Sequence, residues 1–281
     1  MQAYFDCGRF RFPLGPKARP LVMGILNVTP DSFADGGRYQ DLEFAIARAE
    51  QMLEDGVDII DIGGESSRPG AQPLPLSQEM DRVLPVVYAL RDFGVPLSVD
   101  TYKPELMREA LVAGADMIND IHGFTQAGAV EAVATSDCGL CVMHMQASPQ
   151  TMQQAPRYDD PVREVTHFLQ ERVQVLQAAG VASSRLSIDP GFGFGKNLEH
   201  NLALLRAIGQ ISQALELPVL AGMSRKSMLG QITGKPIEER LAASVAAHVL
   251  ACARGARIVR VHDVAATVDA VKVWHALEQQ D

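Results

Sequence analysis

Several polar side chains stand directly after short apolar runs, where they could bind one ligand together. Asp100, Asn119 and Asp189 each end such a run. Carboxylates accept paired N–H bonds, and an amide both donates and accepts, so these three residues suit a planar, nitrogen-rich heterocycle. Each could instead be a core polar group bonded to backbone, but their shared placement favours a common site.

A second set of residues offers positive charge for an anion. Segment 224–227, Ser-Arg-Lys-Ser, follows one apolar run, and Arg260 and His262 lie two positions apart at the end of the next. Alternate residues of a strand share a face, so the Arg260 and His262 side chains are expected to point the same way. The two segments together predict a phosphate site.

The apolar runs that precede these residues predict the fold. Each is too short for a buried helix, is rich in Val, Ile and Leu, and gives way to Gly, Pro or Ser before a helix-like stretch. Such runs are typical of parallel strands buried on both faces. Eight of them in roughly 250 residues predict an α/β protein of one domain, a (β/α)8 TIM barrel with its active site at the carboxyl ends of the strands. The runs are 21–27, 57–64, 95–100, 115–120, 140–144, 186–189, 217–222 and 257–263.

Composition limits the class of protein. The chain has 281 residues and a net charge of −9, which fits one enzyme domain and argues against binding to nucleic acid or an anionic membrane. No apolar stretch reaches the ~18 residues of a membrane span, and the start lacks the plan of a signal peptide, so a cytoplasmic location is expected. Four scattered cysteines favour reduced thiols over a disulfide framework.

Domain and helix boundaries follow from turn residues. Residues 1–20 are expected to be an N-terminal extension, with 4–13 a short hairpin that closes the amino-terminal mouth of the barrel, and 21–281 to be the catalytic domain. Asp160 is predicted to cap a helix that ends at Gly180. Pro236 is expected to begin another helix, which ends near Gly255.

The loop after the first run, 27–37, is longer than a tight connection needs, which is typical of lids and binding loops. Asn27 offers a neutral oxygen that suits Mg²⁺ held mainly by water and phosphate oxygens, although capping of a turn has equal weight. Asp31 and Asp35 could be solvated turn residues, or acidic groups brought over the site when the loop closes.

Two further loops carry binding features. Residues 63–70 place two hydroxyls beside Arg68 among glycines, which suits oxyanion recognition; an exposed surface arginine is the alternative. Residues 189–196, Asp-Pro-Gly-Phe-Gly-Phe-Gly-Lys, would let the backbone approach a flat ligand between phenylalanine side chains. They differ from the phosphate loop of a nucleotide triphosphatase, because Asn197 stands where Ser or Thr would follow the lysine.

These segments closely resemble the dihydropteroate synthase family of folate biosynthesis. The matching motifs, in the family's order over residues 21–264, are LNVTPDSFADGG, DIGGESSRPGA, SVDTYKP, INDI, VMHMQ, DPGFGFGKN, GMSRKS and RVHDV. The resemblance implies a homodimeric transferase that condenses 7,8-dihydropterin pyrophosphate with 4-aminobenzoate to give 7,8-dihydropteroate and pyrophosphate. It also implies Mg²⁺ as the cofactor and competitive inhibition by sulfonamides.

The resemblance further implies a role for each matching residue. The implied catalytic residues are Asp100, Lys226, Arg260, His262 and Asp35. The pterin would contact Asp100, Asn119, Met143, Asp189, Gly222 and Lys226. The diphosphate would contact Asn27, Ser67, Arg260 and His262, with Asn27 as the metal ligand. The aminobenzoate would contact Phe33, Ser66, Ser67, Arg68, Pro69, Phe194, Lys226 and Ser227.

The implied chemistry agrees with these residue types. As diphosphate leaves, Asp100 would stabilise positive charge on the pterin methylene, and closed loops would exclude water while the arylamine attacks. The sequence departs from the family at Ser67, which replaces the usual Thr, and at Ala34, which stands at a common Ser position. The first change would modestly alter affinity for aminobenzoate or sulfonamides.

Other functions explain the sequence less well. A methyltetrahydrofolate-dependent methyltransferase shares the pterin-binding barrel but has no use for a diphosphate site. A non-catalytic pterin-binding relative would be expected to have lost Lys226, Arg68 or the loop after Asn27, and all three are present. A metal-dependent hydrolase barrel would need a ligand set such as His-x-His on the first run, which this chain lacks.

Overall fold

The computed structural model of the chain describes residues 3–15, 17–28, 37–66, 68 and 70–278. Eight parallel strands form a closed barrel in the order β10-β3-β4-β5-β6-β7-β8-β9, which confirms the predicted (β/α)8 fold. The strands are β3 (Leu21–Asn27), β4 (Ile59–Gly63), β5 (Leu97–Asp100), β6 (Met117–Asp120), β7 (Gly139–Met143), β8 (Leu186–Asp189), β9 (Val219–Ala221) and β10 (Ala256–Val261).

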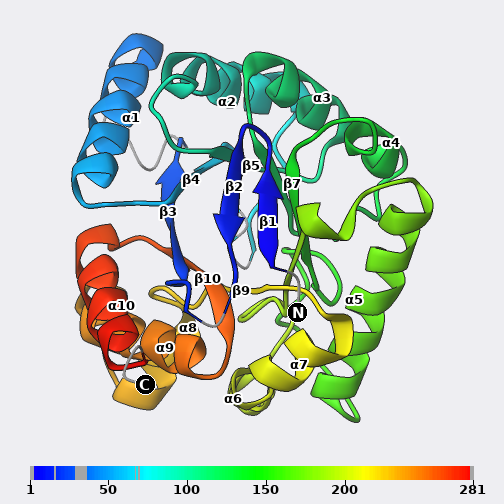
Figure 1. Cartoon of the computed structure of the whole chain (residues 1–281), viewed down its shortest axis with the longest axis vertical. Helices are drawn as coiled ribbons and strands as arrows, with labels where there is room; N and C mark the ends of the chain where they lie inside the picture. Colours follow the sequence, from blue (N-terminus) through cyan, green and yellow to red (C-terminus); the bar gives the residue numbers. More distant parts are fainter. Residues whose placement is uncertain (1–2, 16, 29–36, 67, 69, 279–281) are drawn as a thin grey trace.

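Helices surround the barrel and cover the outward faces of its strands (Figure 1). Their bounds are α1 (Gly37–Glu54), α2 (Leu76–Leu90), α3 (Pro104–Ala113), α4 (Ala129–Val133), α5 (Pro161–Ala178), α6 (Leu198–Arg206), α7 (Ile208–Leu215), α8 (Ser227–Thr233), α9 (Leu241–Ala253) and α10 (Val264–Glu278). No helix in the described part of the chain is both long enough and apolar enough to span a membrane.

Each predicted apolar run overlaps one of the barrel strands, but four strands (β4, β5, β6 and β9) begin two residues later than predicted, and β7 and β10 begin one residue earlier. Val57, Ala115 and Leu217 precede their strands and are nevertheless buried. A buried position favours an apolar residue whether or not its backbone joins the sheet. A strand also needs ladder hydrogen bonds to its neighbours. The apolar pattern therefore marks the core more faithfully than it marks the first residue of a strand.

Helix α5 begins as predicted, whereas the helix expected at Pro236 begins later. The Asp160 carboxylate accepts from the N–H groups of Val162 and Arg163 at 3.1 and 3.0 Å, which satisfies two otherwise unpaired donors. After Pro236 the chain forms only a 3₁₀ turn (Ile237–Glu239), and α9 starts at Leu241. The Arg240 side chain donates to the Lys235 and Arg225 carbonyls, so it fixes a bend where a continuous helix was expected.

The amino-terminal mouth of the barrel is covered by a two-stranded antiparallel sheet, β1 (Tyr4–Cys7) and β2 (Phe10–Pro13), drawn in dark blue across the barrel in Figure 1. Its apolar side chains pack with the inward-facing residues at that end of the strands. The packed residues are Phe5, Cys7, Leu14, Leu21, Met23, Ile59, Met117, Cys141, Leu220 and Ile258. Polar side chains in the barrel therefore gather at the opposite, carboxyl end.

Candidate active site

The register of the parallel strands aligns polar residues at the carboxyl rim. Gly63 of β4 pairs with Asn27 of β3 on one side and with Asp100 of β5 on the other, and Asp100 pairs with Asn119 of β6. A Cβ atom on Gly63 would lie 3.6 Å from Asn27 Oδ1 and 3.8 Å from Asp100 Cβ. Because Gly63 has no side chain, the space between Asn27 and Asp100 stays open to a ligand.

Arg260 of β10 lies between two acidic side chains inside this rim. Its Nε donates to Asp61 Oδ2 at 2.6 Å, and its Nη2 donates to Asp100 Oδ2 at 2.7 Å. Asp61 is fully buried, and the Arg260 side chain is 19% exposed. A single guanidinium thus contacts two carboxylates, one buried and one half-buried.

Burial and ion pairing act in opposite directions on this group. Burial raises the pKa of Asp100 to about 7; Arg260 opposes this change, and the nearby Asp61 carboxylate adds to it. Burial lowers the pKa of Arg260, but Asp61 and Asp100 together raise it above its ordinary value. Arg260 therefore stays protonated, and its 2.7 Å contact favours the ionised form of Asp100.

Asp61 has an acceptor atom that is suited to a ligand donor. Its Oδ2 accepts from Arg260 and, at 3.3 Å, from Asn119 Nδ2, whereas Oδ1 is buried with no hydrogen-bond partner among the described residues. A buried oxygen without a donor is costly, so an N–H group of a bound heterocycle would be stabilising there. The sequence offered one signal for this residue, a single carboxylate in the run Ile-Ile-Asp-Ile-Gly, but predicted no role for it.

Asp189, Gly222 and Lys226 lie on the β8 and β9 side of Arg260. A Cβ atom on Gly222 would lie 3.7 Å from Arg260 Cβ and 3.9 Å from Asp189 Oδ2. The Lys226 ammonium lies 4.4 Å from the centre of the Phe194 ring, which is a cation–π contact. The structure thus brings Asp189, Gly222 and Lys226 together beside Arg260, which also contacts Asp100 on β5.

Burial changes the proton affinity of Lys226. It lowers the pKa of Lys226 to about 8, with Asp189 opposing this change and Arg260 adding to it. Nζ donates to the Phe192 carbonyl, which holds the ammonium toward the loop after β8. Lys226 is therefore a cation at neutral pH that can lose its proton at mildly basic pH.

His262 is held by the loop that follows β9. Ser224 Oγ accepts from the backbone N–H of His262 at 3.1 Å and lies 2.9 Å from its Nδ1. Burial, followed by the charges of Arg260 and Arg225, lowers the pKa of His262 to about 4, so the ring is neutral at neutral pH. Ser224 thus fixes the orientation of a neutral imidazole beside the Arg260 strand.

The loops after β7 and β8 are fixed to each other. Lys196 Nζ lies 3.0 Å from His144 Nδ1 and donates to the Phe194 carbonyl at 2.9 Å. Gly191 has a φ of +72°, and a Cβ atom there would lie 1.8 Å from the His144 carbonyl oxygen, so no other residue fits. His144 directly follows Met143, which is 3% exposed. The loop that carries Phe194 is therefore held against the end of β7.

The remaining predicted site residues are less enclosed. Ser66 is half-buried and Arg68 is exposed, and the charge of Arg68 contributes to the lowered pKa of His262, so it lies on that side of the mouth. Ser227 is exposed at the first turn of α8. Five residues named from the sequence for this site lie outside the described residues and are not placed: Asp31, Phe33, Asp35, Ser67 and Pro69.

The barrel and its rim match a known class of enzyme. The family model of pterin binding enzymes matches residues 23–262, which include every strand residue at the rim described above. A pterin is a planar ring with several N–H groups, and the carboxylates and the amide at the rim can pair with such groups. The chain is therefore a pterin-binding (β/α)8 enzyme.

Similar proteins narrow the class further. The dihydropteroate synthase of Escherichia coli K12 is 49% identical over 260 residues, which are 92% of each chain. The structure of Burkholderia cenocepacia dihydropteroate synthase complexed with 7,8-dihydropteroate is 55% identical, with a TM-score of 0.89 over 98% of this chain and 96% of that one. That of the Yersinia pestis enzyme with a sulfonamide drug complex is 47% identical, with a TM-score of 0.92 over 99% and 100%. The chain belongs to the dihydropteroate synthase family.

Proposed function

We propose that this chain condenses (7,8-dihydropterin-6-yl)methyl diphosphate with 4-aminobenzoate, giving 7,8-dihydropteroate and pyrophosphate for folate biosynthesis. The observation that carries the proposal is the Arg260 guanidinium held between Asp61 and Asp100 at the carboxyl rim. This arrangement places carboxylates that can accept hydrogen bonds from a pterin next to a fixed positive charge that can bind the departing diphosphate. The 55% identity to a relative whose structure contains dihydropteroate supports the same product.

The acidic side chains are proposed to bind and activate the pterin. Asp61 Oδ1 and the carboxylates of Asp100 and Asp189 are acceptors for its ring N–H groups, while Asn119 can donate or accept. As the carbon–oxygen bond breaks, the methylene carbon gains positive charge. The ionised form of Asp100, which the contact with Arg260 favours, would stabilise that charge electrostatically.

Arg260 and His262 are proposed to bind the diphosphate. Arg260 uses Nε and Nη2 for the two aspartates, so its third nitrogen, Nη1, remains for phosphate oxygens. Ser224 holds the His262 ring at 2.9 Å, which limits the reorganisation needed when the anion binds. Both side chains would stabilise negative charge on the departing diphosphate.

Asn27 is proposed to hold Mg²⁺. Its amide oxygen borders the open space beside Gly63, as its 3.6 Å separation from a Cβ atom at that position shows. One neutral oxygen suits an ion that keeps several waters and otherwise binds phosphate oxygens. When bound, the ion would neutralise charge on the diphosphate.

The aminobenzoate is proposed to bind above the pterin methylene, between the loops after β4, β8 and β9. Phe194 and Lys226 form one wall through their 4.4 Å cation–π contact, and Ser66, Arg68 and Ser227 offer polar groups for the carboxylate. Sulfonamides, which share the arylamine shape, would compete for this space.

A homodimer is proposed from the apolar surface of the last helices. Six of the eleven exposed large hydrophobic side chains in the described part of the chain lie between positions 232 and 277, and these are Ile232, Ile237, Leu241, Leu250, Val273 and Leu277. Exposed apolar side chains that gather on one part of a surface are typical of interaction sites. Sedimentation velocity of the wild type and of Leu250→Lys tests this, and a wild-type monomer would refute it.

The proposed reaction is tested by pyrophosphate release. Purified protein receives dihydropterin pyrophosphate and Mg²⁺, with and without 4-aminobenzoate, while dihydropteroate is followed by mass. We expect one pyrophosphate released per dihydropteroate formed, dependent on the arylamine, and slower turnover after Mg²⁺ is chelated. Tight pterin binding without product would refute the proposal and indicate a catalytically silent relative.

A further inference from the structure

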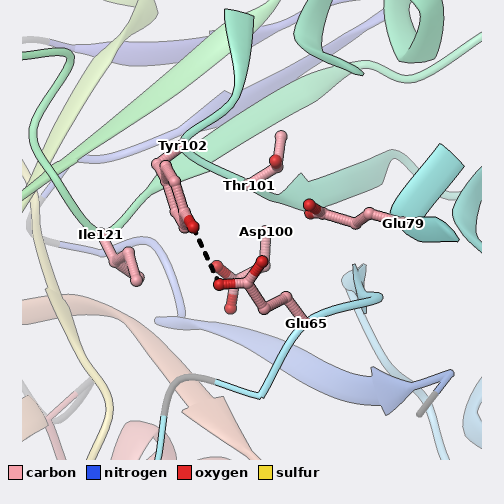
Figure 2. Close-up of a pocket in the computed structure, with 6 residues that line it drawn as sticks. All are labelled: Glu65, Glu79, Asp100, Thr101, Tyr102 and Ile121. Atoms are coloured by element: carbon pink, nitrogen blue, oxygen red, sulfur yellow. Dashed lines mark hydrogen bonds between the residues drawn. The ribbon is translucent and has the colours of Figure 1, made fainter. Parts of the chain in front are cut away.

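The carboxylate of Glu65, which follows β4, accepts three hydrogen bonds from residues far apart in the sequence. Oε1 accepts from the Tyr102 hydroxyl at 2.9 Å, and Oε2 accepts from Lys103 Nζ at 2.6 Å and from the Leu74 backbone N–H at 2.9 Å. Its side chain is only 13% exposed. Figure 2 shows Glu65 beside Asp100, with the bond to Tyr102 drawn.

Lys103 extends this contact to the other end of the same loop. Its Nζ donates to Glu65 Oε2, to the Leu74 carbonyl at 2.5 Å and to Glu79 Oε2 at 2.5 Å. Glu79 lies in α2 and is 1% exposed, and the Lys103 side chain is 14% exposed. One ammonium thus joins the first residue of the 65–74 loop, its last residue and the helix that follows it.

The two segments joined by Glu65 belong to different halves of the proposed site. Tyr102 and Lys103 lie two and three residues after Asp100, which ends β5 where the pterin is proposed to bind. Ser66 and Arg68, proposed for the aminobenzoate, follow Glu65. Arg82 donates to the Gly64 carbonyl at 3.0 Å, so the residue before Glu65 is fixed as well.

We propose that Glu65 is a positioning residue that sets the 65–74 loop at a fixed place relative to Asp100, through Tyr102 and Lys103, and thereby places Ser66 and Arg68 for 4-aminobenzoate. This inference rests on the function proposed above. In this role Glu65 acts through Ser66 and Arg68 and not through the reacting atoms. Its charge is needed because an ionised acceptor binds the lysine and two further donors more strongly than a neutral one does.

Glu65→Gln tests the proposal in the full-length protein. The amide keeps the size of the side chain but loses the negative charge and one acceptor atom. We expect the KM for 4-aminobenzoate to rise about tenfold, the effect of losing roughly one charge-assisted hydrogen bond, while the dissociation constant of dihydropterin pyrophosphate changes less than about twofold. A residue needed only for folding would instead lower the active fraction and the melting temperature, and leave both constants unchanged.

Tyr102→Phe provides a second, milder variant. It removes the hydroxyl that binds Glu65 and keeps the ring, which stacks on His122 at 4.3 Å. We expect a smaller rise in the KM for 4-aminobenzoate, and no further rise when Tyr102→Phe is added to Glu65→Gln, because Tyr102 acts through Glu65. Equal effects of Tyr102→Phe in both backgrounds would overturn the proposal.

Gln72→Ala is the matched control within the same loop. Gln72 is exposed, and among the described residues its side chain accepts only a long 3.4 Å bond from Gln150, so wild-type constants are expected. If Glu65→Gln has the same aminobenzoate KM as Gln72→Ala, the positioning role is wrong. A wild-type protein that makes no dihydropteroate would refute the proposed reaction instead, which separates the two failures.

Discussion

Arg260 Nη2 donates to Asp100 Oδ2 at 2.7 Å, across the barrel rim from β10 to β5. The same guanidinium is anchored by Asp61 at 2.6 Å, so its position is fixed from two strands. From the sequence, Arg260 was grouped with His262 as a phosphate site, apart from Asp100. In the structure Arg260 contacts Asp100, and its charge also acts on His262. The proposed pterin and diphosphate sites are therefore electrostatically connected.

Replacement of Asp100 by Asn is expected to affect turnover more than binding. The amide keeps the size of the side chain and one acceptor, but it cannot stabilise positive charge on the methylene or neutralise Arg260. We expect kcat to fall about 100-fold or more, a typical cost of losing one electrostatic contact in a transition state. Steady-state kinetics and pterin titration measure the two effects, and near-equal kcat values in both proteins would disprove this role of Asp100.

Lys226 predicts a basic limit to the pH profile. With a pKa of about 8, the residue is charged below that pH and neutral above it. If its charge is needed, kcat/KM, which reports the free enzyme, falls as pH rises through about 8. Lys226→Arg keeps the charge throughout, so its profile should lose this limb even if its activity is lower. An identical limb in both proteins would assign the titration to another group.

Ser224→Ala is expected to weaken binding of the diphosphate part of the substrate. Without Ser224 Oγ, the backbone N–H of His262 loses its acceptor and the ring loses its 2.9 Å contact. We expect about fivefold to tenfold weaker binding of dihydropterin pyrophosphate, the scale of about one hydrogen bond. The corresponding dihydropterin alcohol, in which a hydroxyl replaces the diphosphate, serves as the control ligand in calorimetry. It should bind equally to both proteins, and a parallel loss for the two ligands would contradict the prediction.

Asp116, at the opposite end of the barrel, is expected to affect stability alone. This buried carboxylate accepts from Arg9 Nε at 2.8 Å and from the backbone N–H groups of Arg9 and Leu97 at 3.2 and 3.1 Å. Asp116→Ala leaves the Leu97 N–H without this acceptor in the core and should lower the free energy of unfolding by about 2–3 kcal/mol. Urea denaturation measures this loss. Substrate KM values should not change, because the amino-terminal face of such barrels serves stability.

Much of the fold could be predicted because buried parallel strands are apolar on both faces. Every predicted run overlaps a strand, and polar residues such as Asp100, Asn119 and Asp189 stand at or next to the strand ends. The start of α9 was not predictable in this way, because it depends on bonds from Arg240 to carbonyls at positions 225 and 235. Such contacts join separate segments and leave no periodic pattern in the sequence.

The sequence by itself determined the barrel, the rim on which the site lies and the family, since apolar periodicity and local motifs are properties of short segments. The tertiary structure decided which charges meet. It paired Arg260 with Asp61 and Asp100, residues 199 and 160 positions away, and it joined Glu65 to Lys103 and Glu79. Those partners depend on strand register and on closure of the barrel, which bring distant side chains within hydrogen-bond distance. Closure also removes these side chains from water, and charge interactions are stronger in the protein interior than in water.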